Sequence, residues 1–411
     1  SGRVVWDVRW RDAGRRGCAR SRTFERRRDA EVFEQEIRRQ LRLGGLAHDA
    51  GHETLADFAQ EWWRLYAEVK LAKRTLLMYA DIWDRYILER LGGLPLRRIT
   101  PRVVDAFQAD LRGAGVPDPT ILKTLSLLQG VLRRAVLWER IPSNPVAAVS
   151  KPHQRRGRVI DPPSPYQVEA MRLQLLLDGK IGDAALVTLL AYAGLRPGEA
   201  LGLVWRNVRD RTLLIEQAVS IGELKDTKTR RLRAVRLMAP LARDLELWRE
   251  RTPHGDVGDL VFPRADGTPW TEHDYKNWRR RDFAPAAKAA GLPKLRPYDL
   301  RHAFVPLLLA EGKNVVDAAG QAGHAPSLSL DTYGHLIAEL DGAERRPAED
   351  LIWEAREAGV RYVCDAATDK GDDPAPEEAE SPAFAGLSRG ALLRTRTADP
   401  LLTMEVLYLL S

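Results

Sequence analysis

Three short segments of the sequence carry side chains that could act on a phosphate ester. They contain Arg196 in AYAGLRPGEAL, Arg301 in RPYDLRH, and both His324 and Tyr333 in GHAPSLSLDTYGH. An arginine presents a rigid fork of donors to two phosphate oxygens and stays protonated at any working pH. A tyrosine hydroxyl can serve as a nucleophile toward phosphorus. Side chains of these types could neutralise and attack a phosphodiester.

The order and rough spacing of these segments resemble the catalytic boxes of the tyrosine recombinases, the phage-integrase family of site-specific DNA recombinases. The resemblance runs from about Arg3 to Glu344 and is strongest between Ala191 and Leu336. It implies that Tyr333 attacks a DNA phosphate, giving a 3′-phosphotyrosine link and a free 5′ hydroxyl. Because that link keeps the bond energy for rejoining, no high-energy cofactor is expected.

The resemblance also implies a proton donor and a further phosphate ligand. Lys228 matches the family's general-acid lysine, which protonates the departing 5′ oxygen. Lys225 and Arg230 lie close to it in the sequence and compete for that role. His324 matches the position at which the family has His or Trp, donating a hydrogen bond to the scissile phosphate.

Two further residues are expected to support this site. Glu199 stands one helical turn after Arg196 and can hold that guanidinium in position, although a simple helix salt bridge would use the same pair. His302 follows Arg301 as it does in many relatives. A buried, hydrogen-bonded core histidine is the simpler interpretation of His302.

Tyr298 departs from the family pattern, because it stands three residues before Arg301, where the family most often has His. A phenol can donate to a phosphate, but it cannot act as a base near neutral pH as an imidazole can. The departure motivates one alternative, a catalytically impaired DNA-binding remnant of an integrase. A second alternative keeps the chemistry and is a type IB topoisomerase-like enzyme, against which a separate N-terminal ribbon argues.

Length and composition are typical of a multidomain globular protein. A chain of 411 residues is longer than one hydrophobic core usually organises, and 44% of its residues are hydrophobic and 29% charged. No apolar run approaches the ~18 residues that a membrane-spanning helix needs. Cys18 and Cys364 lie far apart, and the sequence has no phosphate-binding loop, His-Glu-x-x-His motif or cysteine pair at metal spacing. We expect no cofactor, no metal and a cytoplasmic location.

The charge balance favours a polyanionic partner. The net charge is +7 and the pI is near 9.4. From the resemblance we expect double-stranded DNA attachment sites as the partner, with a monomer free in solution and a homo-tetramer on DNA. An excision or DNA-bending accessory protein is a further expected partner, and association with the nucleoid of a bacterial host is the expected location. No membrane partner is expected.

Sequence periodicity predicts a multidomain fold. It comprises a small N-terminal β-ribbon plus helix, an all-α core-binding helical bundle, and a mixed, mainly α-helical catalytic domain with a small antiparallel sheet. Alternation predicts the ribbon over 4–10 and 18–24, and helical spacing predicts its helix from Asp29 to Leu43. Four helices are expected in the bundle, over 55–71, 75–91, 100–111 and 118–138. Catalytic-domain strands are expected over 212–218, 223–228 and 234–237.

These patterns and the resemblance set the expected domain boundaries. They are an arm-type DNA-binding domain over 1–45, a core-binding DNA domain over 52–148, a linker over 149–163, a catalytic domain over 164–358, and a largely disordered tail over 359–411. The helix near 347–357 is the candidate for exchange with a neighbouring subunit. Aromatic residues of the bundle are expected to be core more often than base-stacking surface. Ten basic residues are candidates for DNA contacts: Arg9, Arg11, Arg20, Arg22, Lys70, Lys73, Arg74, Lys123, Arg133 and Arg134.

Overall fold

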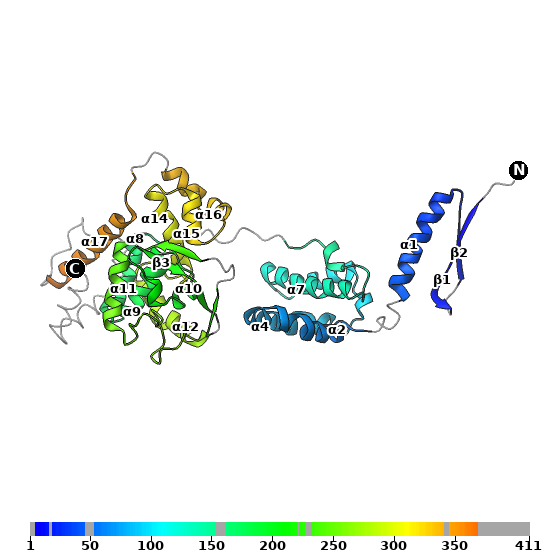
Figure 1. Cartoon of the computed structure of the whole chain (residues 1–411), viewed down its shortest axis with the longest axis horizontal. Coiled ribbons are helices and arrows are strands. Elements are labelled where there is room, and N and C mark those ends of the chain that lie inside the picture. The colour runs from blue at the N-terminus through cyan, green and yellow to red at the C-terminus, as the bar shows by residue number, and fades with distance from the viewer. Residues whose placement is uncertain are drawn as a thin grey trace. The chain divides into compact units, whose positions relative to one another are not determined.

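The computed structural model describes residues 5–15, 19–45, 53–152, 161–220, 222–226, 232–340 and 345–368. The chain divides into two compact units, Ser1–Gly157 and Arg158–Ser411, and a separate hydrophobic core lies in each (Figure 1). Within the described ranges, no helix has both the length and the apolar character needed to cross a bilayer. The same ranges contain no group of three or more His, Cys, Asp or Glu side chains placed to hold a metal ion.

The N-terminal segment has the predicted ribbon and helix. Strand β1 (Trp6–Arg15) pairs antiparallel with β2 (Ala19–Phe24), and α1 (Arg27–Gly45) lies against them. The Phe33 ring of α1 lies 5.4 Å from the Trp10 ring and 5.0 Å from the Phe24 ring. Because alternate side chains of a strand point to opposite faces, these contacts place α1 on one face of the ribbon.

The rest of the first unit is a helical bundle, as predicted. A capping box begins it, in which the Thr54 hydroxyl accepts from the Asp57 backbone N–H at 3.1 Å. Apolar residues at helical spacing, among them Phe58, Trp62 and Leu125, are fully buried between the helices. The helices are α2 (Leu55–Trp62), a π-helical turn (Trp63–Ala67), α3 (Glu68–Lys70), α4 (Lys73–Ile82), a second π-helical turn (Trp83–Leu88), α5 (Glu89–Leu91), α6 (Pro101–Gly113) and α7 (Asp118–Leu137).

Two buried helices form the centre of the second unit. Every residue of α8 (Pro165–Leu177) from Val168 onward is buried, and so is every residue of α9 (Ile181–Tyr192) from Ala184 onward. Helices that are buried on all sides need neighbours around them. Helices α13 (Ala284–Ala289) and α17 (Ala348–Thr368) pack on α8, and α11 (Ala239–Arg251) packs on α9. The other helices that contribute to the same core are α12 (Glu272–Trp278), α14 (Phe304–Ala310), α15 (Val315–Ala322) and α16 (Pro326–Leu340).

The predicted strand over 212–218 is two strands, so that prediction was wrong in its extent. The chain changes pairing partner at Glu216, whose carboxylate accepts from the Asn207 side-chain amide at 3.1 Å. Buried Leu213 and Ile215 fix the first strand, whereas the second is half-buried along its length. The two antiparallel pairs are β3 (Thr212–Ile215) with β6 (Arg233–Arg236), and β4 (Gln217–Ser220) with β5 (Glu223–Asp226).

Helix α17 corrects the predicted start of the C-terminal tail. It extends to Thr368, so the first ten residues of the predicted tail are helical, and residues 369–411 lie outside the described ranges. It packs within its own unit, and exchange of the helix near 347–357 with a neighbouring subunit stays a prediction. Buried Arg356 donates to the Asp244 carboxylate at 2.6 Å and to the Pro240 carbonyl at 3.0 Å, and Arg172 donates to Asp244 at 2.9 Å. Withdrawing one member of such a buried charge network is costly.

Candidate active site

Arg196 is fixed at the start of the short helix α10 (Pro197–Leu201) by its neighbour Glu199. The Arg196 backbone N–H donates to one Glu199 oxygen at 2.9 Å, and Nη1 donates to the other at 2.7 Å. Its Nη2 donates to the Gly323 carbonyl at 2.8 Å. The expected support of Arg196 by Glu199 is therefore present, and the guanidinium is still 40% exposed.

A second arginine, Arg233 of β6, completes the binding of Glu199. Its Nη1 and Nη2 donate to the two Glu199 oxygens at 2.9 and 2.8 Å, and its Nε donates to the Gln321 carbonyl at 3.0 Å. Burial alone would raise the pKa of Glu199, but Arg233 and Arg196 hold that pKa at about 2. Arg233 was not among the predicted site residues. The two oxygens of a carboxylate can accept more hydrogen bonds than one arginine supplies, so Glu199 itself indicated that a second donor was needed.

Arg301 is buried, with 4% of its surface exposed, and it links its own segment to the segment that contains Arg196. It comes from the 3₁₀ turn Asp299–Ala303, and its guanidinium donates to the carbonyls of Gly194 and Ala322. Burial and the neighbouring charge of Arg196 lower the pKa of Arg301 to about 10, so the group stays positive at neutral pH. The hydrogen bonds of Arg196 and Arg301 thus hold the glycine turn at Gly194 close to the end of α15.

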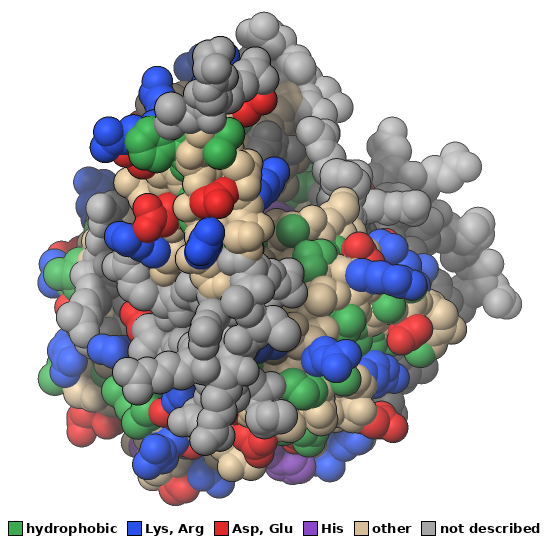
Figure 2. Space-filling view, turned by 90° about the vertical axis from the view of Figure 1, so that its right-hand side faces the viewer, with side chains coloured by type: hydrophobic (Ala, Val, Ile, Leu, Met, Phe, Trp, Pro, Cys, Tyr) green, Lys and Arg blue, Asp and Glu red, His purple; other side chains and the backbone are tan. Residues whose placement is uncertain are grey.

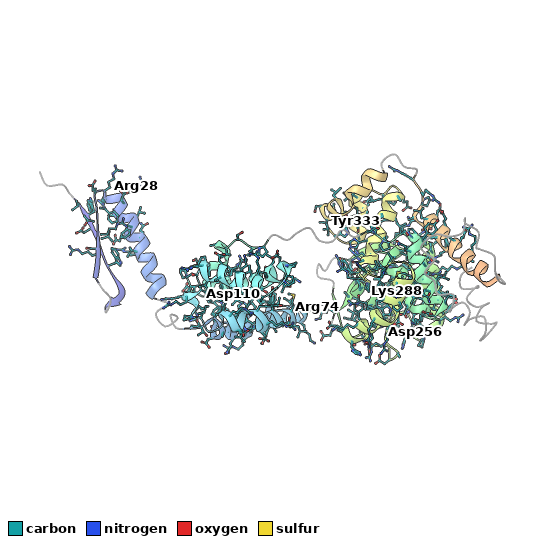
Figure 3. The ribbon with its side chains drawn as sticks, turned by 180° about the vertical axis from the view of Figure 1, so that it is seen from behind. Arg28, Arg74, Asp110, Asp256, Lys288 and Tyr333 are labelled. Carbon is teal, nitrogen blue, oxygen red and sulfur yellow. The ribbon has the colours of Figure 1, made fainter. Side chains whose placement is uncertain are left out.

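Tyr333 of α16 is 3% exposed and lies in the second unit (Figure 3). Its hydroxyl is 2.7 Å from Nδ1 of His302. Burial raises the pKa of Tyr333, and the charge of Arg301 opposes that rise. Burial also lowers the pKa of His302, which favours the neutral imidazole that can accept a proton. His302 is thus half-buried, where the simpler interpretation expected a buried core histidine, and its hydrogen-bond partner is the proposed nucleophile.

His324 and Tyr298 lie at the edges of this group. Nδ1 of His324 is 3.2 Å from the Ser329 hydroxyl, and burial together with the charge of Arg301 lowers the His324 pKa. Tyr298 is 45% exposed, and its ring lies 6.2 Å from the His302 ring in an edge-on arrangement. An exposed phenol of this kind is free to meet a ligand.

The predicted general acid Lys228 lies outside the described residues, as does its competitor Arg230. The other competitor, Lys225 in β5, is described, and its Nζ lies 3.1 Å from the Glu223 carboxylate. The strands β5 and β6 flank the segment that carries Lys228. Its role stays a prediction.

The candidate DNA contacts of the ribbon lie on two different faces. Arg9 is opposite Ser21 in the ladder, on the face away from α1, and its side chain is 79% exposed. The Arg22 guanidinium lies 5.1 Å from the Phe33 ring, on the face that α1 covers. Arg9 is therefore better placed than Arg22 to enter a groove with the free face. Arg11 and Arg20 lie in the strands, but their side chains are outside the described part of the structure.

The candidates of the bundle are at its surface. Lys70, Lys73, Arg74, Lys123 and Arg133 are exposed, and Arg134 is half-buried. In the space-filling view, Lys and Arg side chains occur among Asp, Glu and hydrophobic side chains (Figure 2). Because side chains of both charges occur in that view, positive charge alone does not single out a DNA contact, which has to be argued from the surroundings of each residue.

Comparison with known proteins assigns the class. Residues 167–339 match the phage integrase family, and residues 54–112 match the phage integrase N-terminal SAM-like domain. The chain is 26% identical over 337 residues to an integrase of Streptomyces ambofaciens, covering 76% of this chain and 82% of the relative. It is 25% identical over 292 residues to the tyrosine recombinase XerC of Mesorhizobium japonicum, covering 67% and 89%.

Solved structures share the fold. The Tn1549 transposon integrase in complex with a circular intermediate DNA matches with a TM-score of 0.58 at 17% identity, over 70% of this chain and 99% of that one. A lambda integrase tetramer bound to a Holliday junction matches with a TM-score of 0.53 at 18% identity, over 77% and 92%. The chain belongs to the tyrosine recombinases, enzymes that break and rejoin DNA. Within them it belongs with the integrases of phages and mobile elements.

Proposed function

We propose that this chain is a site-specific recombinase that cuts and rejoins attachment-site DNA through a 3′-phosphotyrosine intermediate, without a metal or high-energy cofactor. The observation that carries the proposal is the 2.7 Å contact between the Tyr333 hydroxyl and His302. It lies beside Arg301, whose charge acts on the phenol. A nucleophile, a proton acceptor and a phosphate-binding cation thus occur together.

Each step of the cut has a candidate residue. Arg196 and Arg301 would bind the non-bridging oxygens of the phosphate and neutralise the charge that develops on them. His324 and the exposed Tyr298 hydroxyl would donate further hydrogen bonds to that phosphate. As the bond from Tyr333 Oη to phosphorus forms, the bond from phosphorus to the 5′ oxygen breaks, and Lys228 would give that oxygen a proton.

His302 would take the proton that Tyr333 loses. The phenol is protonated at neutral pH because burial raises its pKa, so it needs a base as it attacks. The family most often has a histidine three residues before the second arginine, and this chain has Tyr298 there. His302 Nδ1 is already within hydrogen-bond distance of the phenol and can replace that missing imidazole.

The assembly follows from the relatives. We infer that the ribbon and the bundle bind separate DNA elements, as arm-type and core-binding domains, and that the second unit carries the chemistry. The lambda integrase tetramer on a Holliday junction supports a homo-tetramer on paired sites here, formed from monomers. An excision or DNA-bending protein would assist, and the work would take place at the nucleoid of a bacterial cell.

Covalent trapping tests the proposal. Nicked suicide duplexes from the ends of the element are incubated with wild type and with Tyr333→Phe, and the denatured products are separated by size. A protein–DNA adduct in the wild type that is missing in Tyr333→Phe is the expected result. Site-specific binding without any adduct would favour the DNA-binding remnant, which Tyr298 motivates. An adduct with relaxation of supercoils but no joining of two sites would favour the topoisomerase-like enzyme.

A further inference from the structure

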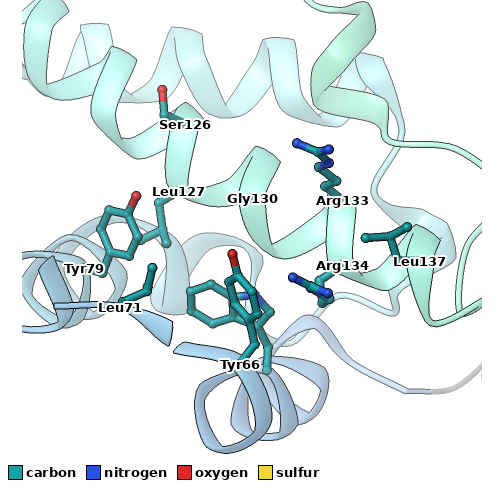
Figure 4. A pocket seen from close by; sticks show the side chains of 10 residues that line it. Tyr66, Leu71, Tyr79, Ser126, Leu127, Gly130, Arg133, Arg134 and Leu137 are labelled. Atoms are coloured by element: carbon teal, nitrogen blue, oxygen red, sulfur yellow. The ribbon is translucent and has the colours of Figure 1, made fainter. Parts of the chain in front are cut away.

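The helical bundle of the first unit contains an open hollow of about 300 Å³ (Figure 4). Its walls come from the end of α2 with the π-helical turn after it, from Leu71 between α3 and α4, from Tyr79 of α4, and from α7. Its size is at the lower end of the range for pockets that take small ligands. The lining residues are Trp62, Tyr66, Leu71, Tyr79, Ser126, Leu127, Gly130, Arg133, Arg134 and Leu137.

Aromatic rings and arginines dominate the lining. Tyr66 and Tyr79 are half-buried, so part of each ring surface is open, and Trp62 lies behind them at 5.9 Å from the Tyr66 ring. The Arg134 guanidinium lies over the Tyr66 ring at 3.9 Å from its centre. A planar cation stacked on this ring shows that its face accepts another planar group. None of the described lining residues is a carboxylate, so an anionic ligand meets no repulsion there.

Gly130 keeps the hollow open. It lies within the 20-residue helix α7, where glycine is destabilising relative to alanine. Packing does not require a glycine at this position, because a Cβ built on Gly130 would meet no heavy atom within 4 Å. Gly130 lines the hollow together with Leu127 and Arg134, which lie on the same face of α7 (Figure 4), so a side chain added there would occupy part of its space. The missing side chain leaves room for a ligand.

More basic residues lie near the lining residues along the chain. Helical spacing puts Lys123 on the same face of α7 as the lining residues Leu127, Gly130 and Arg134. Lys70, Lys73 and Arg74 are within three residues of the lining residue Leu71. Of the six candidate DNA contacts of the bundle, Arg133 and Arg134 therefore line the hollow, and the other four are close to its lining residues in sequence or on the same helix face. Cations around an aromatic pocket match the arrangement that binds unstacked nucleotides.

We propose that the hollow binds one base of the attachment site, unstacked from the duplex and laid against Tyr66 and Tyr79, with Arg133 and Arg134 on the flanking phosphates. This proposal rests on the proposed function, because it presumes that the bundle binds DNA. In the free protein the Arg134 guanidinium occupies the face of Tyr66, and the base replaces it. Unstacking costs least where a base is already mispaired, so the proposal has a measurable signature.

The experiment uses the full-length chain and duplexes of the attachment site, each with one mismatch or one 2-aminopurine at successive positions. At one position per half-site, the mismatch should raise the affinity of wild type about tenfold, and 2-aminopurine there should change in fluorescence on binding. Gly130→Leu fills the hollow without removing a charge, and should abolish both effects. Gly113→Leu, at another glycine whose Cβ would meet nothing within 4 Å, is the matched control and should keep them.

Three outcomes decide the matter. If no position responds, or if the response persists in Gly130→Leu, the base-binding proposal is wrong. If Gly130→Leu binds DNA like wild type but no longer assembles on paired sites, the hollow takes a side chain of a second copy instead. Adduct formation through Tyr333 is scored in parallel, so a wild type that forms a normal adduct but shows no base signal at any position overturns this proposal alone. Thermal unfolding of Gly130→Leu excludes a folding defect.

Discussion

Glu199 is the residue on which the geometry of the candidate site depends. Its two oxygens accept four hydrogen bonds, which come from Arg233 and from the side chain and backbone of Arg196. Carboxylates bound in this way stay ionised inside a protein because every charge is opposed by a close partner. Arg196 can therefore be partly exposed to a substrate and still be held in one orientation.

Glu199→Gln should lower the free energy of unfolding by about 3 kcal/mol, since it leaves Arg233, whose side chain is 14% exposed, facing a neutral amide. The Glu199 pKa is about 2 in the folded chain against an ordinary 4.5, so its stabilisation is present above about pH 4.5 and is lost as the pH falls toward 2. Denaturant unfolding at several pH values measures this. Glu223→Gln, in an exposed ion pair with Lys225, is the control and should change stability by under about 0.5 kcal/mol. An equal effect of the two variants would contradict the argument.

His302→Asn should slow adduct formation by about 10²–10⁴-fold, because the amide can still bond to Tyr333 but cannot take its proton. Burial lowers the His302 pKa, so wild type should stay active below the ordinary value of 6.5 and lose activity once the imidazole is protonated. That loss on the acid side should be absent in the variant. Single-turnover rates against pH are the measurement, with exposed His273→Asn as control. An unchanged acid limb in His302→Asn would remove His302 from the reaction.

Two glycine turns deliver backbone carbonyls to the arginines of the site. Gly194 has a φ of +58° and its carbonyl accepts from Arg301, and Gly323 has a φ of +70° and its carbonyl accepts from Arg196. Residues with a side chain rarely adopt this left-handed conformation. The turns that end α9 and α15 thus place the two candidate catalytic arginines as directly as the helices do.

Gly194→Ala should destabilise the chain by about 2–4 kcal/mol, from the left-handed backbone and from overpacking. Its Cβ would lie 2.6 Å from the ring of Phe304, which is fully buried and cannot withdraw easily. Gly320→Ala is the matched control, because it lies in helix α15 with nothing within 4 Å and should stabilise by about 0.5–1 kcal/mol. Thermal unfolding distinguishes them, and a neutral Gly194→Ala would show that the turn relaxes without cost.

Local patterns predicted the elements better than they predicted long-range contacts. The bundle helices follow from apolar spacing and caps such as Thr54, and these signals lie within one turn of the helix they start. The split at Glu216 and the link from Arg233 to Glu199 depend on partners distant in sequence, which spacing does not reveal. The length of α17 was missed for the same reason, because Arg356 is paired with residues of α8 and α11.

At the scale of the whole molecule, the two units have separate hydrophobic cores and are joined along the chain by a connector, the predicted linker over 149–163. One core contains residues such as Phe58 and Leu125, and the other contains residues such as Leu189 and Phe304. Each unit should therefore fold by itself. If both units bind the same DNA, the connector raises the affinity of the whole chain for that DNA, because binding of one unit holds the second near its site.

Cutting the connector within residues 153–160, at an introduced protease site, tests this. The cut chain should bind attachment-site DNA about 10²–10⁴-fold more weakly than the uncut chain that carries the same site, since the second binding step is no longer intramolecular. The salt dependence of the affinity should behave differently, because the number of counterions that each unit releases is set by its own phosphate contacts. The slopes of log affinity against log salt for the two isolated fragments should therefore add up to the slope of the uncut chain. A cut chain that binds as tightly as the uncut chain would mean that a single unit supplies all of the affinity.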